Sequence, residues 1–390
     1  MVGGDELKIL LKNAQTYLDN VFQQKDILIS GGKIGQIEEC GTLFSGGCDK
    51  VIDCEGKKAV PGFIDVHTHG AAGIDVNAAT AEGFEKIARF FAAQGTTSCL
   101  VSILTDTPEK TLWCIEEYNK WKTLEHKGAE IIGIHLEGPF LASEYKGAMP
   151  EHLLKKAPDL ELVKRYQDAA CGAVRYMTIS PELEGMPEFI RDVGRLGIKV
   201  AIGHSGASYE RSMEAIANGA VAGTHVGNAM KLLHQHFPAI FGAVLESDVY
   251  CEIICDGLHL HPGTVRILLK AKGMDRAVAI TDSIMAAGLP DGEYKLGVND
   301  VVVSDGDAKL KEGGVRAGST LTLARAYRNL LKFTGSTEEE ILPLLTRNPA
   351  EMLGVCDELG SIEKGKAADI LIMDADRQIC TTIVRGRLCG

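Results

Sequence analysis

Most of the chain repeats one pattern, a short apolar run followed by a longer stretch whose apolar residues recur at helical spacing. The stretch 81–93, for example, places Phe84, Ile87, Ala88 and Phe91 on one helical face. Alternating strands and helices predict a parallel sheet, and eight strands are enough to close it into a (β/α)8 barrel. An open doubly wound sheet is the rival architecture. The expected strands are residues 59–66, 97–103, 131–136, 174–179, 199–202, 220–224, 250–254 and 277–280.

Both ends of the chain have a different texture, with short strand-like runs separated by glycine-rich turns. Residues 26–30 and 33–37 flank Gly31-Gly32, and residues 369–373 and 378–386 behave in the same way. We therefore expect a small β-sandwich domain built from residues 1–58 and 354–390. The barrel, residues 59–353, would be inserted between the two halves. A length of 390 residues fits a large barrel with such a companion.

Composition and charge exclude several classes of protein. A net charge of −12 argues against a nucleic-acid or anionic-membrane partner, which would require a basic face. No apolar stretch reaches the roughly 20 residues that span a bilayer. The start of the chain, MVGGDELKIL, lacks the features of a secretory signal, so we expect a cytoplasmic protein. The eleven cysteines include no CxxC pair and are interpreted as small core residues rather than as disulfides or a metal cluster.

The first expected strand ends in an alternating set of polar residues. Asp65, His67 and His69 are two residues apart, so in a strand their side chains share a face. Two histidines at this spacing can bind one metal ion or two adjacent ions. A pair of hydrogen-bonded core histidines is the alternative.

Four further strands end in a potential ligand: Glu137, His204, His225 and Asp282. Taken alone, a buried Glu137 could equally form a salt bridge with Arg or Lys, since a buried carboxylate needs a compensating group. Because parallel strands present their carboxyl ends at one mouth of a barrel, all of these residues would converge. This convergence favours the barrel over the open sheet. The mixture of imidazoles and carboxylates suits a divalent transition metal such as zinc or iron.

Six motifs together make the chain resemble the N-acetylglucosamine-6-phosphate deacetylases, a branch of the amidohydrolase superfamily. The motifs are PGFIDVHTHG, HLEGPF, GHSGA, TH-x-x-NAM, DGLHLHP and TDS. Glu137 distinguishes this branch from relatives that use a carbamylated lysine. The resemblance covers nearly the whole chain. It implies a metal-binding barrel, a β-sandwich from both chain ends, and a homodimer in which the neighbouring subunit completes the sugar-phosphate pocket.

The resemblance also implies a role for each matching residue. Glu137, His204 and His225 match the tightly held metal site, and His67 and His69 match a second site, so one or two ions per subunit are expected. Asp282 matches the catalytic acid/base, which takes a proton from the attacking water and protonates the departing amine. The implied substrate contacts are Ala148, Asn228, Ala229, His236, Asp256, Gly257, Leu258, His259, Val315, Arg316 and Ala317.

Three positions depart from the pattern of these relatives. Met149 stands where a histidine usually holds the substrate near its acetyl group, and methionine is no strong donor. Gly227 stands where a large residue usually precedes NAM. His236 stands where an arginine is expected to clamp phosphate across the dimer, and histidine does not reproduce that bidentate fork. The candidate replacements are His152 for the first position, and Lys231, His234 and Arg316 for the phosphate; for Arg316 the alternative is a solvated loop charge.

The leading hypothesis is metal-dependent deacetylation of N-acetylglucosamine 6-phosphate to glucosamine 6-phosphate and acetate in amino-sugar catabolism. A deacetylase of N-acetylgalactosamine 6-phosphate, or of an unphosphorylated N-acetyl amino sugar, is the alternative. A cyclic amide hydrolase is disfavoured because Glu137 stands where that group usually has lysine. A non-catalytic scaffold with this fold is disfavoured because every expected ligand and Asp282 are present.

Overall fold

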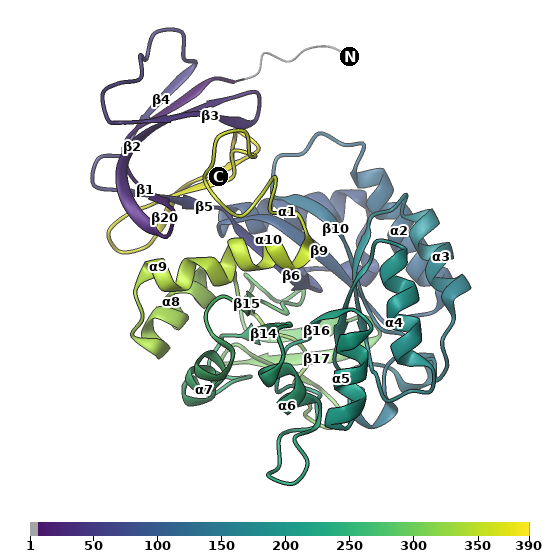
Figure 1. Cartoon of the computed structure of the whole chain (residues 1–390). Helices are drawn as coiled ribbons and strands as arrows, with labels where there is room; N and C mark the ends of the chain where they lie inside the picture. The colour runs from purple at the N-terminus through teal and green to yellow at the C-terminus, as the bar shows by residue number, and fades with distance from the viewer. Residues whose placement is uncertain (1–6, 390) are drawn as a thin grey trace.

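Eight parallel strands form the centre of the molecule in a computed structural model that describes residues 7–389 (Figure 1). Strands that follow one another in the barrel sequence are neighbours in the sheet, and Thr68 at the end of the first strand forms a parallel bridge with Ser283 beyond the last. The sheet therefore closes, and the prediction of a (β/α)8 barrel is confirmed. Its strands are β6 (Phe63–Thr68), β9 (Thr96–Leu104), β10 (Glu130–Glu137), β11 (Val174–Ile179), β12 (Lys199–Ile202), β13 (Ala220–Gly223), β14 (Tyr250–Ile254) and β15 (Ala277–Ile280).

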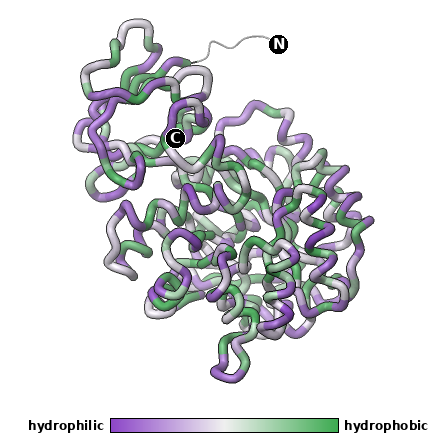
Figure 2. The backbone as a smooth tube through the Cα atoms, in the orientation of Figure 1, coloured by the Kyte–Doolittle hydropathy of each residue, from purple (hydrophilic) through white to green (hydrophobic). Residues whose placement is uncertain are grey.

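The helices surround the barrel and bury one face each. The helix predicted over residues 81–93 has these bounds in the structure. Hydrophilic and hydrophobic residues alternate along the outer helices (Figure 2). No helix within residues 7–389 has the length and apolarity that crossing a membrane requires. The helices are α1 (Ala81–Ala93), α2 (Pro108–Trp121), α3 (Leu160–Ala169), α4 (Met186–Arg195), α5 (Tyr209–Ala217), α6 (Ala239–Glu246), α7 (Pro262–Lys272), α8 (Leu323–Thr334), α9 (Glu338–Ile341) and α10 (Arg347–Leu353), with 3-10 turns η1 (Val76–Ala78), η2 (Ser143–Tyr145), η3 (Glu151–Leu153) and η4 (Leu342–Leu345).

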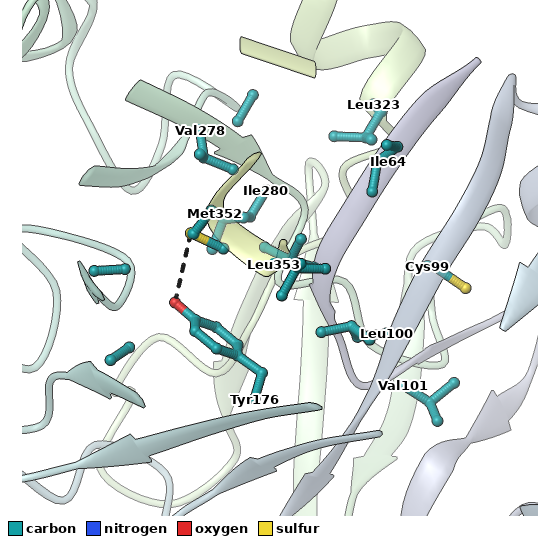
Figure 3. Close-up of a cluster of buried hydrophobic side chains, with 14 of the residues drawn as sticks. Ile64, Cys99, Leu100, Val101, Tyr176, Val278, Ile280, Leu323, Met352 and Leu353 are labelled. Atoms are coloured by element: carbon teal, nitrogen blue, oxygen red, sulfur yellow. Dashed lines mark hydrogen bonds between the residues drawn. The ribbon is translucent and has the colours of Figure 1, made fainter. Parts of the chain in front are cut away.

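Apolar side chains fill the barrel beneath its mouth. Ile64, Leu100, Tyr176 and Val278 come from four different strands and are all fully or almost fully buried. Figure 3 shows Tyr176 pointing towards Met352 of α10, and its hydroxyl lies 3.9 Å from the Met352 sulfur. The polar residues at the mouth therefore stand on a packed and rigid base.

The prediction of one continuous strand over residues 59–66 was wrong. The structure divides this run into β5 (Lys58–Pro61), which belongs to the smaller sheet, and β6, which belongs to the barrel. Gly62 lies at the division, where a Cβ atom would meet the Thr97 hydroxyl oxygen at 2.1 Å. The close approach of the backbone to Thr97 at this point explains why the chain can change sheets there only through glycine.

The smaller sheet combines both ends of the chain, as predicted (Figure 1). Strand β5 joins the two halves because it pairs in parallel with β1 and antiparallel with β19. A separate apolar core that includes Ile9, Ile27 and Ile370 stabilises this domain. The proposed boundaries at residues 58/59 and 353/354 remain a prediction, and residues 1–6 and 390 of that domain lie outside the described part. The other strands are β1 (Ile9–Leu18), β2 (Val21–Ser30), β3 (Lys33–Glu38), β4 (Lys50–Asp53), β19 (Ile370–Met373), β20 (Ile379–Val384) and β21 (Arg387–Cys389).

The sequence reading missed an antiparallel three-stranded sheet that follows β15. It consists of β16 (Gly292–Leu296), β17 (Asn299–Ser304) and β18 (Asp307–Leu310), and a small ribbon of β7 (Gly70–Ala71) and β8 (Ile74–Asp75) lies after β6. The strands of the three-stranded sheet are short and carry several charges, so the alternation of apolar and polar residues along them is weak in the sequence. Leu296 packs with Met149 and Leu104 in a third apolar cluster, which attaches the three-stranded sheet to the barrel mouth.

All eleven cysteines are free thiols. The interpretation as core residues holds for six of them, since the remaining five are partly or fully exposed. The buried thiols are Cys54, Cys99, Cys114, Cys251, Cys255 and Cys389, and the others are Cys40, Cys48, Cys171, Cys356 and Cys380.

A buried aspartate links the smaller sheet to the barrel. Asp369, directly before β19, is 6% exposed; it accepts a hydrogen bond from the Arg385 backbone N–H at 2.7 Å and from the Ser98 hydroxyl at 3.5 Å. Burial raises the pKa of this carboxyl to about 6 despite these donors. Ionising Asp369 at neutral pH therefore costs folding free energy.

We predict that Asp369→Asn gains stability relative to the natural protein as the pH rises from 4 to 7.5. Because the folded-state pKa is raised from 3.8 to about 6, the stabilisation by the bound proton is complete below pH 3.8 and is lost as the pH rises to about 6. The loss amounts to about 3 kcal/mol, which the amide does not suffer. Thermal unfolding at both pH values measures the difference. Asp376→Asn, at an exposed position nearby, should show no such trend, and a difference for Asp369→Asn that is independent of pH would contradict the argument.

Candidate metal centre and active site

The polar residues reach the barrel mouth through an unusual backbone conformation. His204, His225 and Asp282 each lie two residues beyond the end of their strands, and their φ values are 48°, 28° and 49°. A left-handed backbone is costly for residues other than glycine, and such positions gather at functional sites. Here the turn directs each side chain over the mouth of the barrel.

Glu137, His204 and His225 form one compact group of potential ligands. The Nε2 atoms of both histidines lie 3.1 Å from Glu137 Oε1 and 3.1 Å from each other. His204 Nδ1 faces the Tyr145 carbonyl oxygen at 3.0 Å, so the ring proton belongs there and the Nε2 lone pair faces the group. Two imidazole nitrogens and a carboxylate oxygen in such proximity require a cation among them.

His67, His69 and Asp282 form a second group beside the first. The two histidine Nε2 atoms are 3.2 Å apart, and His69 Nε2 lies 3.3 Å from Asp282 Oδ1. His69 Nδ1 faces the Ser102 carbonyl oxygen at 3.1 Å, which again leaves Nε2 free for the centre.

Glu137 stands between the two groups. Its Oε1 lies 3.3 Å from His67 Nε2, and its Oε2 lies 3.1 Å from His69 Nε2. Burial alone would raise the pKa of Glu137, but the neighbouring imidazoles of His67 and His69 and hydrogen bonds from His204 and His225 hold it well below its usual range. One carboxylate is therefore shared by four imidazoles.

The donor set fits a divalent transition metal. In tetrahedral zinc sites with bonds of roughly 2.0–2.1 Å, neighbouring ligand atoms are about 3.3 Å apart. The separations within the Glu137 group are 3.1 Å, close to that value. Burial alone would lower the pKa of His69, but Glu137 and Asp282 raise it to about 9, so in the metal-free protein protons occupy part of the space that suits a cation.

Asp65 shares a strand with His67 and His69 but belongs to neither group. Its Oδ2 accepts a hydrogen bond from the Thr281 hydroxyl at 2.6 Å, and burial raises its pKa to about 6. Asp65 thus fixes the residue that precedes Asp282.

A cavity of about 200 Å³ lies over the two groups. Met149, Leu104 and Leu296 are among its apolar walls. The cavity is bordered by seven of the eleven expected substrate contacts: Ala148, Asn228, Ala229, His259, Val315, Arg316 and Ala317.

The other four expected contacts lie outside this cavity wall. Asp256 Oδ2 is 2.6 Å from His259 Nδ1, and Asp256 Oδ1 accepts the Leu258 backbone N–H at 2.8 Å. Asp256, Gly257 and Leu258 thus form the turn that orients His259. His236 is exposed in the loop between β13 and α6.

Only one of the proposed replacement residues borders the cavity. His152, Lys231 and His234 are exposed away from its wall, whereas Arg316 lies in the wall. Arg316 forms a bidentate pair with Asp307, with Nε–Oδ1 2.7 Å and Nη2–Oδ2 3.0 Å. It is therefore an anchored cation at the rim rather than a solvated loop charge.

Sequence reasoning missed a fully buried glutamate beneath the centre. Glu252 lies in the middle of β14 and contacts His67, His225 and Tyr176. A signal was present in the sequence, since a glutamate interrupts the apolar run of residues 250–254.

Comparisons with known proteins agree with this geometry. The Amidohydrolase family matches residues 59–389. The chain is 34% identical over 367 residues to the N-acetylglucosamine-6-phosphate deacetylase of Lysinibacillus sphaericus, covering 94% of this chain and 93% of the relative. It is 32% identical over 343 residues to the N-acetylgalactosamine-6-phosphate deacetylase of Escherichia coli O157:H7, covering 87% and 90%. The crystal structure of N-acetylglucosamine-6-phosphate deacetylase from Pasteurella multocida superposes with a TM-score of 0.91 at 29% identity, covering 98% and 99%.

We predict that the two ligand groups respond differently to substitution. Glu137→Ala should retain no stoichiometric metal because Glu137 contacts both groups, whereas His69→Ala should keep the ion held by Glu137, His204 and His225. Elemental analysis of dialysed protein measures both. His126 is a half-buried histidine beside Trp121, and His126→Ala is the control, which should bind metal normally. Equal metal loss in Glu137→Ala and His69→Ala would show that the groups are not separate.

Proposed function

The chain belongs to the amidohydrolase family, and we propose that it deacetylates N-acetylglucosamine 6-phosphate to glucosamine 6-phosphate and acetate in amino-sugar catabolism. It is a metal-dependent hydrolase that acts on a linear amide C–N bond. The observation that carries this function is the pair of ligand groups that share Glu137 beside Asp282 at the floor of one cavity. A non-catalytic scaffold would have no use for this convergence of buried polar groups.

The residues proposed to hold the metal are Glu137, His204 and His225 for one ion, and His67 and His69 with Asp282 for a second. Imidazole and carboxylate ligands of this kind suit zinc or iron. When bound, a divalent ion lowers the pKa of water from about 15.7 toward about 7 and polarises an amide carbonyl.

Asp282 is the proposed acid/base of the reaction. Burial alone would raise its pKa, but the hydrogen bond from His69 and the charges of His67 and His69 lower it, so the group is ionised and accepts a proton. It takes one proton from the attacking water and donates it to the nitrogen as the C–N bond breaks. The Ser319 backbone N–H donates to the Asp282 carbonyl at 2.7 Å and holds the residue in place.

The cavity wall supplies the proposed contacts to the sugar. Asp256 accepts a hydrogen bond from His259 Nδ1, which leaves His259 Nε2 to face the substrate. Met149 gives an apolar wall suited to the acetyl methyl group. The remaining proposed contacts within one subunit are Ala148, Asn228, Ala229, Val315 and Ala317.

Arg316 is the proposed partner of the substrate phosphate. Asp307 is shared by Arg316 and by Lys309, whose Nζ lies 2.8 Å from Asp307 Oδ2, so the three side chains carry a net single positive charge. The Asp307 carboxylate occupies one edge of the guanidinium, and the remaining N–H groups are free for an anion. Arg316 would thereby replace the arginine that relatives supply across a dimer.

A homodimer and a cytoplasmic location complete the proposal. Leu232, Leu233 and Phe237 are 58%, 55% and 68% exposed in the loop that protrudes between β13 and α6 (Figure 1). A second copy of the chain would cover these apolar side chains and bring His236 towards the neighbouring site. Eleven free thiols suit a reducing compartment, and the acidic net charge disfavours nucleic-acid and membrane partners.

N-acetylgalactosamine 6-phosphate is the second candidate substrate. The chain is 32% identical to the N-acetylgalactosamine-6-phosphate deacetylase and 34% identical to the N-acetylglucosamine-6-phosphate deacetylase. Sequence identity therefore does not separate the two substrates. The two sugars differ in the configuration of one hydroxyl group, and a single hydrogen bond in the cavity would distinguish them.

We predict that Asp282→Asn keeps the ion at Glu137, His204 and His225 but lowers kcat at least about 100-fold, because the amide cannot transfer the proton. Steady-state acetate release with metal content verified checks this. The exposed Asp357→Asn is a matched control and should retain full activity. An Asp282→Asn enzyme with undiminished turnover would remove Asp282 from the reaction.

We predict that Arg316→Ala raises KM for the 6-phosphate substrate by about 10–100-fold, the loss expected for a charge-assisted hydrogen bond. The kcat and the rate with unphosphorylated sugars should change little, because Arg316 does not contact the metal groups. The check is to measure kcat and KM of the natural enzyme and of Arg316→Ala with a panel of N-acetyl hexosamines, each with and without the 6-phosphate. No preference for phosphate in the natural enzyme would overturn the sugar-phosphate assignment; a preference that survives in Arg316→Ala would overturn only the role of Arg316.

A further inference from the structure

Glu252 is a fully buried acidic residue with no role in the mechanism above. It lies inside the barrel on β14, and its accessible surface is zero. Within residues 7–389 no Lys or Arg side chain pairs with it; its one ion-pair partner is His67. A carboxyl group in such a position needs a physical reason, because burying it without compensating partners destabilises the fold.

Both oxygens of Glu252 act as hydrogen-bond acceptors. The Tyr176 hydroxyl donates to Oε1 at 2.5 Å, and the His225 backbone N–H donates to Oε2 at 3.1 Å. His67 Nδ1 lies 3.4 Å from the same Oε2. With an acceptor oxygen of Glu252 facing it, Nδ1 is the His67 ring nitrogen that carries the proton.

These contacts fix one ligand of each metal group. The carboxylate keeps the His67 proton on Nδ1, so that Nε2 faces His69 and Asp282. Among residues 7–389, Glu252 is the partner of His67 Nδ1. The nearby His135, whose ring lies 4.5 Å from that of His67, is already hydrogen-bonded to Ser102 and Thr178 at 2.9 Å each. The bond to the His225 N–H also supports the left-handed turn that carries His225.

Charge balance shows which ion depends on Glu252. Glu137 and Asp282 bring two negative charges, which compensate one divalent ion. A second divalent ion leaves two positive charges in excess in a buried site. Glu252 lies directly behind His67, which belongs to the second group and not to the first, and its carboxyl group faces the Nδ1 atom of that ligand.

We propose that Glu252, held by Tyr176, is a positioning residue that secures the second ion at His67, His69 and Asp282, and so determines whether the centre holds two ions or one. The inference rests on the metal centre proposed above. Carboxylates that orient a histidine ligand typically raise metal affinity by roughly 10–100-fold.

The test is a chelator titration of the full-length metal-loaded protein, with released metal counted by elemental analysis. The natural protein should lose its ions in two steps. Glu252→Gln keeps one oxygen that can accept from the His225 N–H, so the ion at Glu137, His204 and His225 should be held with nearly unchanged affinity. The second ion should bind about 10–100-fold more weakly, because the negative charge behind His67 is lost. Tyr176→Phe should weaken the same step by a smaller factor because the carboxylate remains. Glu117→Gln removes a buried carboxylate in α2, far from the centre, and should leave both steps unchanged.

Substitution with Co²⁺ gives a readout that a merely structural role would not change. At a Co²⁺ concentration that just fills both sites of the natural protein, Glu252→Gln should retain the absorption of the ion in the Glu137 group and lose the contribution of the second ion. If Glu252→Gln does not fold, Tyr176→Phe is judged by the same criterion.

Four outcomes overturn the inference: a natural protein that binds one ion only, two steps unchanged in Glu252→Gln, equal weakening of both steps, or, where Tyr176→Phe carries the test, unchanged steps in that variant. A natural protein that binds no metal at all would instead overturn the proposed function. The two failures are therefore distinguishable in one titration.

Discussion

The centre of this molecule depends on one carboxylate shared by four imidazoles. Glu137 lies within 3.1–3.3 Å of the Nε2 atoms of His67, His69, His204 and His225, and all five side chains are buried. Nitrogen lone pairs at such distances repel one another unless a proton or a metal ion lies between them. The structure therefore concentrates donor atoms in a way that has a physical explanation only when a cation is bound, and the chemistry of an amidohydrolase follows from that cation.

The rigid apolar interior of the barrel supports this concentration of polar groups at its mouth. Apolar side chains such as Leu100, Tyr176 and Val278 fill the interior beneath the mouth. Backbone hydrogen bonds hold the left-handed turns at His204, His225 and Asp282. Asp282 N–H donates to the His67 carbonyl at 2.9 Å, so the first and last strands of the barrel meet at the reaction centre. Closure of the sheet and assembly of the site are the same structural event.

Under the proposed function, recognition of the substrate is where this chain is expected to differ from its relatives. Met149 is 2% exposed and packs with Leu104 and Leu296, so an apolar wall stands where a histidine would donate. Arg316 is anchored by Asp307, and the hydrogen bond from Arg316 lowers the Asp307 pKa to about 2. Asp307 begins β18 and Arg316 follows that strand, whereas the proposed metal ligands lie at the ends of the barrel strands. The proposed phosphate contact can therefore vary while the metal groups stay fixed.

The sequence by itself determined the barrel, the helix over residues 81–93 and the candidate metal ligands, because strand and helix periodicities are local and every candidate ligand lies at or just beyond the end of a strand. Glu137, His204, His225 and Asp282 could be assigned to one rim since parallel strands all end on the same side. Only the tertiary structure decided that the run 59–66 is divided between two sheets at Gly62, that Asp307 engages Arg316, and that His152, Lys231 and His234 lie away from the cavity. It also revealed Glu252 beneath His67. These features depend on contacts between segments far apart in the chain, and neither periodicity nor spacing records which side chains meet across a closed barrel.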